Sequence, residues 1–306
     1  MPDAWTAERV VDAELARALL AAQFPELAGA SLAPLGTGWD NTAWLVAGSW
    51  VFRFPRRPIA VPLIEREIAL LPAIAPRVPL PIPVPEKAGR PEERFPWPWA
   101  GHRLVPGRTA DSAALADDAR AAAAVPLARF LAALHAFPPG EAAALGAGGD
   151  DIGRLDVAAR GETARAALSD LRGRGVLDTA DVARVERVLD GARAPASAPA
   201  PARTLVHGDL YARHLLVDGA GRLAGVIDWG DVHLGGPAVD LSVAHRFLPP
   251  GARDAFRRAY GPIDEATWRL AGFRAAAHAA RTLLYAVCVG DTDLAREERR
   301  TLGGLD

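Results

Sequence analysis

A short apolar run, a charged loop and a hairpin turn constrain this chain of 306 residues most strongly. The run ends at Val206 and places the loop that carries Asp209 at the end of a strand. The segment 218–221, Asp-Gly-Ala-Gly, has the composition of a hairpin turn. A second apolar run follows the turn, ends at Ile227 and is followed directly by Asp228. The sequence therefore predicts that the hairpin brings Asp228 back beside Asp209, with both carboxylates facing one cavity.

Two carboxylates in this arrangement are typical of phosphoryl-transfer enzymes. In kinases one aspartate accepts or orients the proton of the substrate hydroxyl, and another holds the Mg²⁺ that bridges the nucleotide phosphates. Asp209 is accordingly the candidate catalytic base and Asp228 the candidate metal ligand. Aspartates that merely cap turns would explain neither the apolar flanks nor the pairing of the two motifs. In the same loop Arg213 is a second candidate catalytic residue, and His207 is a candidate structural support.

The motifs His-Gly-Asp at 207–209 and Ile-Asp-Trp at 227–229 resemble those of the aminoglycoside phosphotransferase superfamily. Where that family usually has an asparagine that binds a second Mg²⁺, this chain has His214. The loop is in this respect similar to that of macrolide 2′-phosphotransferases. Imidazole is a poorer partner for Mg²⁺ than oxygen is. His214 is therefore either a metal ligand through a neutral ring nitrogen or a residue that hydrogen-bonds the loop or a phosphate.

Length and charge narrow the classes of protein that remain. The chain is long enough for two packed lobes, and its formal net charge of −2 gives no general basis for binding nucleic acid or an anionic membrane. Its one cysteine, Cys288, excludes an intramolecular disulfide and is expected to pack in a core. Neither a secretion signal nor a transmembrane segment is expected. We expect a soluble, cytoplasmic monomer.

Strand-like segments come first and helix-like segments later. Strands are predicted at 32–35, 42–46 and 50–54, an extended proline-rich stretch at 77–86, and a low-complexity connector at 194–202. Helices are predicted at 7–24, 64–74, 111–137 with a break at Pro126, 157–171, 179–189, 238–246, 252–260, 265–289 and 293–302. This order is α+β and matches the two-lobed protein-kinase-like fold. The small β-rich N-lobe would span 1–106 and the larger helical C-lobe 107–306.

The β-rich lobe carries a loop that is expected to lie over the nucleotide phosphates. Gly36 and Gly38 lie between two predicted strands, with Asn41 near the place of the third glycine of the kinase loop. Backbone N–H groups of such a turn can bind phosphate. A Gly-x-Gly between strands is also common in plain hairpins, so the interpretation depends on its agreement with the catalytic hairpin.

A charged pair is expected next to this loop. Arg53 takes the place of the strand lysine of kinases, and a guanidinium can bind phosphate through two donors. Its expected partner is Glu67 on the following helix, although Glu65 is also available there. Arg56 and Arg57 compete for the same acids, and a solvated surface pair is the alternative.

The predicted strand 101–105 is expected to be the hinge that binds the purine base. The contacts would come from the backbone of Arg103, Leu104 and Val105. Because backbone contacts leave no side-chain signature, the sequence does not distinguish ATP from GTP. The expected co-substrate is therefore ATP or GTP with Mg²⁺.

The segment Gly-Pro-Ala-Val-Asp-Leu at 236–241 resembles a family segment whose second aspartate braces the catalytic loop, a role that falls to Asp240. Asp231 and His233 follow the metal aspartate and either contact the acceptor or belong to a surface loop. Phe273 and Tyr285 offer apolar surface on the C-terminal helices. From Asp240 to the last residue the sequence contains nine acidic residues and ten arginines. A polycationic aminoglycoside would be expected to require a surplus of carboxylates, and this part of the sequence has none.

These features predict an enzyme that transfers the γ-phosphate of ATP or GTP to a hydroxyl of a small molecule. The resemblance implies an antibiotic acceptor of the macrolide or aminoglycoside type. Two alternatives remain open at this point. One is a kinase of a metabolite alcohol, and the other is a non-catalytic, nucleotide-binding pseudokinase in which an arginine and a histidine replace the usual lysine and asparagine.

Overall fold

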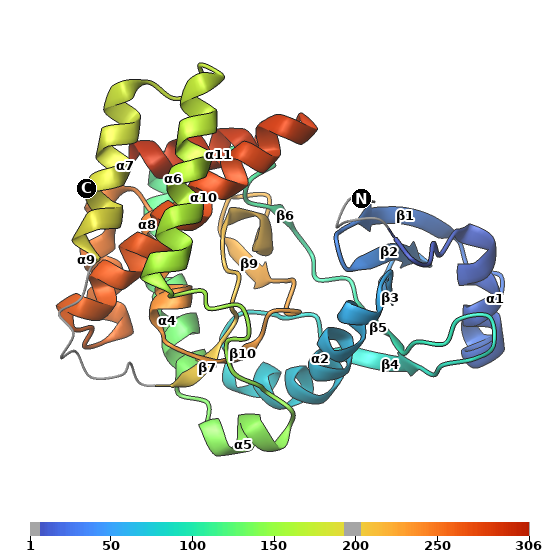
Figure 1. Ribbon diagram of the computed structural model, residues 1–306. Coiled ribbons are helices and arrows are strands. Elements are labelled where there is room, and N and C mark those ends of the chain that lie inside the picture. Colours follow the sequence, from blue (N-terminus) through green and yellow to red (C-terminus); the bar gives the residue numbers. More distant parts are fainter. Residues whose placement is uncertain (1–6, 193–202, 306) are drawn as a thin grey trace. The chain divides into compact units, whose positions relative to one another are not determined.

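The computed structural model describes residues 7–192 and 203–305, which form two compact units. The connector predicted at 194–202 lies outside the described residues. The N-terminal unit comprises the chain to Pro76, Pro81–Val105 and Asp228–Asp231, and the C-terminal unit comprises Arg77–Leu80, Pro106–Ile227 and Val232–Asp306. The α+β class is confirmed, with a β-sheet N-terminal region and a helical C-terminal part (Figure 1).

The N-terminal unit is built on an antiparallel sheet with the strand order β1-β2-β3-β5-β4. Its elements are β1 (Leu32–Thr37), β2 (Asn41–Val46), β3 (Trp50–Pro55), β4 (Pro85–Gly89), β5 (Trp99–Arg103), α1 (Ala13–Gln23) and α2 (Val61–Ile74). The three predicted strands are confirmed. The first helix begins later than expected because Asp12 caps it and accepts a hydrogen bond from the N–H of Leu15.

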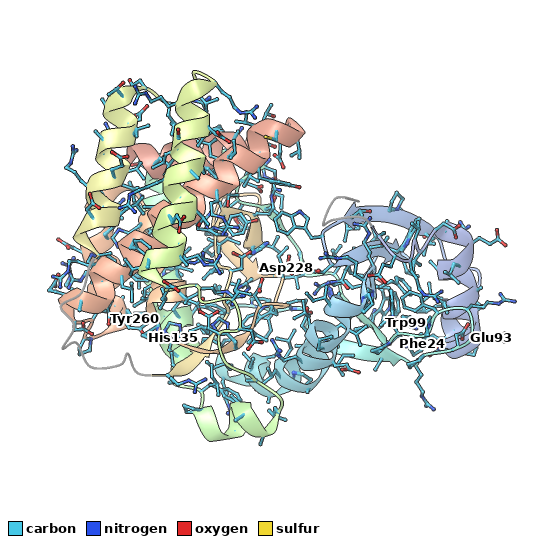
Figure 2. The ribbon with its side chains drawn as sticks, in the orientation of Figure 1. Phe24, Glu93, Trp99, His135, Asp228 and Tyr260 are labelled. Atoms are coloured by element: carbon cyan, nitrogen blue, oxygen red, sulfur yellow. The ribbon has the colours of Figure 1, made fainter. Side chains whose placement is uncertain are left out.

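Aromatic rings fill the core of this unit. Strand β3 alternates, so that Phe52 and Phe54 lie in the core while Arg53 points to the opposite face. Trp99 of β5 packs edge-on against Phe24, with 5.4 Å between the ring centroids (Figure 2). This alternation directs the Arg53 side chain away from the core.

The C-terminal unit is mainly helical. Its helices are α3 (Asp117–Ala122), α4 (Ala124–His135), α5 (Pro139–Ala144), α6 (Val157–Gly173), α7 (Thr179–Gly191), α8 (Ala238–Phe247), α9 (Arg253–Tyr260), α10 (Glu265–Val289) and α11 (Thr292–Gly303). Helix α10 packs against α6, α7, α8 and α11 (Figure 1). Strand β7 (Thr204–Val206) pairs with β10 (His233–Gly235), and β8 (Leu215–Val217) pairs with both β6 (Arg108–Thr109) and β9 (Leu223–Val226). The hairpin predicted after the catalytic loop is the β8–β9 pair.

Some expectations about these helices were wrong. The helical segment expected from 111 begins at Asp117, and its break lies at Ala123. Pro126 is the third residue of α4, where a backbone N–H would have no partner within the helix, so the proline is tolerated. Cys288 is exposed near the end of α10 instead of packed in a core. Among the described residues, no helix is both long and apolar enough to cross a membrane.

Candidate active site

The loop that carries Asp209 is held at its start by a buried carboxylate. Asp240, the third residue of α8, is fully buried and accepts hydrogen bonds from the N–H groups of His207 (2.7 Å) and Gly208 (2.9 Å). Gly208 has a φ of +93°, which a residue with a Cβ rarely adopts. Asp240 thus fixes the two peptide groups that precede Asp209.

A second layer of side chains supports Asp240. His135 of α4 places Nε2 3.2 Å from Oδ2 of Asp240 and Nδ1 2.8 Å from the hydroxyl of Tyr260 on α9 (Figure 2). Burial alone would raise the pKa of Asp240, but the hydrogen bonds from His135 and the loop amides outweigh it and keep this pKa below its ordinary value. Asp240 is therefore a buried carboxylate anion, and the loop amides form charge-assisted hydrogen bonds with it.

His207 connects the loop to the end of the hairpin. Its Nε2 donates to the carbonyl of Ile227 (3.0 Å), and its Nδ1 accepts a longer hydrogen bond from the N–H of Asp209 (3.3 Å). The ring is fully buried, and this burial lowers its pKa. A neutral, buried ring bonded to backbone on both sides positions the loop.

His214 also bonds to the loop. Its Nδ1 lies 2.6 Å from the backbone carbonyl of Asp209, so Nδ1 carries the proton. The structure thus contains the loop hydrogen bond that was one of the two interpretations of His214. Metal binding would have to use Nε2, and it remains a proposal.

Arg213 does not fit a catalytic role. Its Nε donates to Asp111 (2.8 Å) and one terminal nitrogen to Asp291 (2.7 Å). Asp291 also caps the first turn of α11. Because its guanidinium is held between two carboxylates, we correct the sequence interpretation and assign Arg213 to anchoring the loop.

Two side chains of α10 approach Asp209, and the sequence interpretation missed both. Nε2 of His278 lies 3.4 Å from Oδ1 of Asp209, and a terminal nitrogen of Arg274 lies 3.8 Å from the same oxygen. The Asp209 side chain is 22% exposed. The signal in the sequence is a pair of polar residues four positions apart, Arg274 and His278, in a stretch whose other residues are alanines. The sequence does not show that this pair lies beside the loop of Asp209, because that contact depends on the tertiary structure.

The N-terminal unit contains a second charged cluster. Nη1 of Arg53 lies 2.5 Å from Oε2 of the buried Glu67, as expected, and Nη2 lies 3.4 Å from Oδ1 of Asp228. Burial raises the pKa of Glu67 to about 7, although Arg53 opposes the shift. The competing arginines are used elsewhere: Arg56 donates to the carbonyl of Gly38, and Arg57 pairs with Asp40.

Asp228 has a left-handed backbone. Its φ is +64°, which is uncommon for a residue other than glycine and is enriched at functional sites. Its side chain is 51% exposed. Among the described residues, no three histidine, cysteine, aspartate or glutamate side chains are grouped to hold a metal ion. A Mg²⁺ ion bound by Asp228 would take its other ligands from phosphate and water, as this ion often does.

Of the two glycines of the predicted loop, Gly36 lies within β1 and Gly38 lies in the turn between β1 and β2. Gly38 donates to the carbonyl of Asn41 (3.0 Å). Neither Gly36 nor Gly38 has a positive φ, and a Cβ on Gly36 would meet no atom of the described residues within 4 Å. The protein itself therefore does not require glycine at position 36, whereas a ligand lying close to the backbone would.

The hinge strand lies two residues earlier than predicted, because β5 runs from Trp99 to Arg103 and leaves Leu104 and Val105 outside it. The N–H of Leu104 donates to the carbonyl of Ser49, so it is not available to a base. The Arg103 guanidinium stacks on Trp50, 3.9 Å from the ring centroid. Within the described chain no group accepts a hydrogen bond from the N–H of Val105.

The four candidate acceptor residues lie in different environments. Phe273 is fully buried in the helical core, and His233 is buried in β10, so neither forms an accessible surface and both predictions are corrected. Asp231 is partly exposed. Tyr285 lines an open hollow of about 430 Å³ between α6 and α10, whose other lining residues are Thr163, Ala166, Ala167, Asp170, Arg281, Leu284 and Cys288.

A family model described as the phosphotransferase enzyme family matches residues 31–273. The chain belongs to this family. A comparison with curated protein sequences gives no match. The family membership makes this protein a kinase-like small-molecule phosphotransferase, and the prediction of phosphoryl-transfer chemistry is confirmed. Nothing in the comparisons favours a pseudokinase.

Solved structures of antibiotic phosphotransferases have the same fold. The GDP complex of wild-type aminoglycoside 2′-phosphotransferase-IIIa is 24% identical with a TM-score of 0.72, covering 96% of this chain and 98% of that one. The GDP and kanamycin complex of APH(2″)-IIia is 25% identical with a TM-score of 0.70, covering 94% and 96%. The macrolide 2′-phosphotransferase MphH from Brachybacterium faecium is 24% identical with a TM-score of 0.59, covering 96% and 97%. The expected protein-kinase-like fold is confirmed.

Proposed function

We propose that this phosphotransferase transfers the γ-phosphoryl group of ATP or GTP to a hydroxyl of an antibiotic-like small molecule, with Asp209 as the catalytic base. The observation that carries the proposal is the rigid mounting of Asp209. Asp240 holds the two preceding peptide groups, and the Asp209 carboxylate remains partly accessible. A positioned carboxylate of this kind accepts the proton of a hydroxyl as that hydroxyl attacks phosphorus.

The N-lobe, residues 1–106, is proposed to bind the nucleotide. Arg53, held by Glu67, would grip the phosphates, and the loop of Gly36 and Gly38 would lie over them. Of the three expected hinge residues, Val105 has the backbone N–H that would bind the base. Asp228 would hold Mg²⁺, which when bound neutralises phosphate charge. GDP in two of the related structures favours a guanine nucleotide as one of the donors to be tested.

The acceptor is proposed to bind to the helical lobe, residues 107–306, and charge favours a macrolide type over an aminoglycoside type. Arg154, Arg160 and Arg246 all act electrostatically on Arg274 beside Asp209. Several ammonium groups would be repelled by this cluster, whereas a largely apolar molecule with at most one would be repelled less. The hollow that Tyr285 lines is the proposed surface for its apolar part.

The test is a screen of macrolides, aminoglycosides and metabolite alcohols, each with ATP and GTP in Mg²⁺, and with phosphorylated acceptor detected by mass spectrometry. We expect a macrolide to be phosphorylated fastest. Turnover of aminoglycosides alone would contradict the electrostatic argument, and turnover of metabolite alcohols alone would contradict the antibiotic assignment. No transfer to any acceptor, with the nucleotide bound, would contradict the proposed function.

Cys288 offers a separate test of the acceptor surface. It is the chain's single cysteine and lines the same hollow as Tyr285. A bound macrolide should slow its alkylation by a maleimide and should do so less in Tyr285→Ala. If a macrolide that is a substrate leaves the alkylation rate unchanged, the acceptor binds elsewhere.

A further inference from the structure

The guanidinium of Arg274 is buried beside Asp209, and no residue in the described ranges 7–192 and 203–305 forms a hydrogen bond with it. Arg274 is 7% exposed, and its nearest carboxylate oxygen, Oδ1 of Asp209, is 3.8 Å away. That separation is longer than a hydrogen bond. None of the residues that the structure describes makes a hydrogen bond with this guanidinium. Asp209 therefore balances the charge of Arg274 only in part.

The other charged groups around Arg274 make its position less favourable. Burial lowers the pKa of Arg274 to about 10; Asp209 opposes this shift, and Arg246, Arg154 and Arg160 add to it. The side chain is still charged at neutral pH. A buried cation whose nearest carboxylate is placed too far away for a hydrogen bond destabilises a fold. A ligand oxyanion would supply the partner that the protein does not provide.

His278 faces the same oxygen of Asp209 as Arg274 does, and it lies closer to that oxygen. Nδ1 of His278 lies 2.6 Å from Nη1 of Arg246, which can only donate, so Nδ1 accepts and the ring proton is on Nε2. That Nε2–H faces Oδ1 of Asp209 at 3.4 Å. Arg246 is itself paired with the buried Glu298. Catalytic hydrogen bonds that are long in a ligand-free enzyme often shorten when substrate binds.

We infer that Arg274 binds the charged oxygens of the phosphoryl group as it passes to the acceptor hydroxyl held by Asp209. The inference rests on the proposed phosphoryl transfer. In that step the acceptor oxygen bonds to the γ-phosphorus, the bond from phosphorus to the bridging oxygen breaks, and the nucleoside diphosphate leaves. The hydroxyl proton passes to Asp209. The non-bridging oxygens carry negative charge throughout, and a preorganised guanidinium in a water-poor position stabilises that charge.

The test compares Arg274→Met and Arg274→Lys with Arg269→Met, the same substitution at an exposed site on the same helix. Arg274→Met should lower kcat by roughly 10²–10³-fold, the usual effect of removing one preorganised donor, with little change in the acceptor KM. Arg274→Lys should retain part of the activity. Arg274→Met should also raise the melting temperature, because it removes a buried, incompletely paired charge. Arg269→Met should change neither property.

A binding measurement provides a readout that does not depend on turnover. Nucleoside diphosphate with aluminium fluoride mimics the phosphoryl group in transfer. Wild type should bind this complex more tightly than the diphosphate alone, and Arg274→Met should lose that gain while binding the diphosphate normally.

Three results would overturn the inference. An unchanged kcat with a raised acceptor KM would assign Arg274 to the acceptor, and a lowered melting temperature in Arg274→Met would make it a structural partner of Asp209. Equal binding of the fluoride complex by wild type and Arg274→Met would also contradict it. Failure of the proposed function is distinguishable, because wild type would then transfer no phosphoryl group to any acceptor.

Discussion

Replacing Asp240 by asparagine should weaken the hydrogen bonds that hold the catalytic loop while leaving the proposed catalytic base, Asp209, in place. The carboxylate accepts two backbone N–H groups with its two oxygens, at 2.7 and 2.9 Å, and it is fully buried. An asparagine has one oxygen and one NH₂ group, so one backbone N–H would face another donor. Losing one charge-assisted hydrogen bond and leaving one buried donor unsatisfied should together cost roughly 3–5 kcal/mol of folding stability.

The effect on turnover follows from the position of Asp209, one residue beyond the second braced peptide. A shift of the loop by about 1 Å would lower kcat by roughly 10²-fold. Nucleotide affinity should change much less than kcat, because Asp240 belongs to the C-terminal unit, whereas Arg53, Glu67 and Asp228 belong to the N-terminal one. The measurements are urea unfolding followed by circular dichroism, and steady-state kinetics at a temperature where the variant is folded.

Glu297→Gln is the matched control for this prediction. Glu297 is also a buried carboxylate of the C-terminal unit, and it pairs at 2.7 Å with the buried Arg120, away from the loop. Removing its charge should cost about 3–5 kcal/mol as well, while kcat should stay close to that of wild type. Normal turnover in folded Asp240→Asn, or an equal loss of turnover in Glu297→Gln, would refute the reasoning.

Three further predictions concern the charged groups of the two units. Asp228→Ala should abolish the Mg²⁺-dependent part of nucleotide affinity, and calorimetry showing wild-type affinity in Mg²⁺ would contradict its assignment as metal ligand. Glu67 has a pKa of about 7 when folded against 4.5 in its ordinary state, so its ionisation disfavours the folded state. Relative to Glu67→Gln, wild type should therefore lose up to about 3 kcal/mol of stability as the pH rises from 4.5 through 7, and parallel pH profiles would exclude the shift. His214→Asn keeps a donor near the position of Nδ1 and should keep activity. If His214 also ligates metal, the wild-type enzyme should be at least as active with Mn²⁺ as with Mg²⁺, whereas the variant should be more active with Mg²⁺. Identical metal preferences in the two proteins would restrict His214 to the loop.

Elements with local signals could be predicted from the sequence. The long helix 265–289 was predicted at its observed bounds, and neighbouring residues determine both ends: Asp264 caps its start, and Gly290 adopts a left-handed conformation at its end. The Arg53–Glu67 ion pair also followed from a strand and the helix after it, with suitable charges on each. In these cases residues close in the sequence carry the information.

Features that depend on distant contacts could not be predicted in this way. Arg213 belongs to the catalytic loop, but its two partners, Asp111 and Asp291, are 102 and 78 residues away. The apolar composition of α10 gave no means to decide that Phe273 faces the core while Tyr285 lines a hollow. These assignments depend on which face of a helix its neighbours cover.

The most direct test of the account is the rate of transfer from γ-labelled ATP or GTP to the preferred acceptor, measured in single turnover for wild type and Asp209→Asn. The account predicts a labelled acceptor in wild type and a rate lower by about 10²–10⁴-fold in the variant, the usual contribution of a positioned general base. Nucleotide affinity should be the same in both proteins. An unchanged rate in Asp209→Asn would remove Asp209 from the mechanism and contradict the central claim.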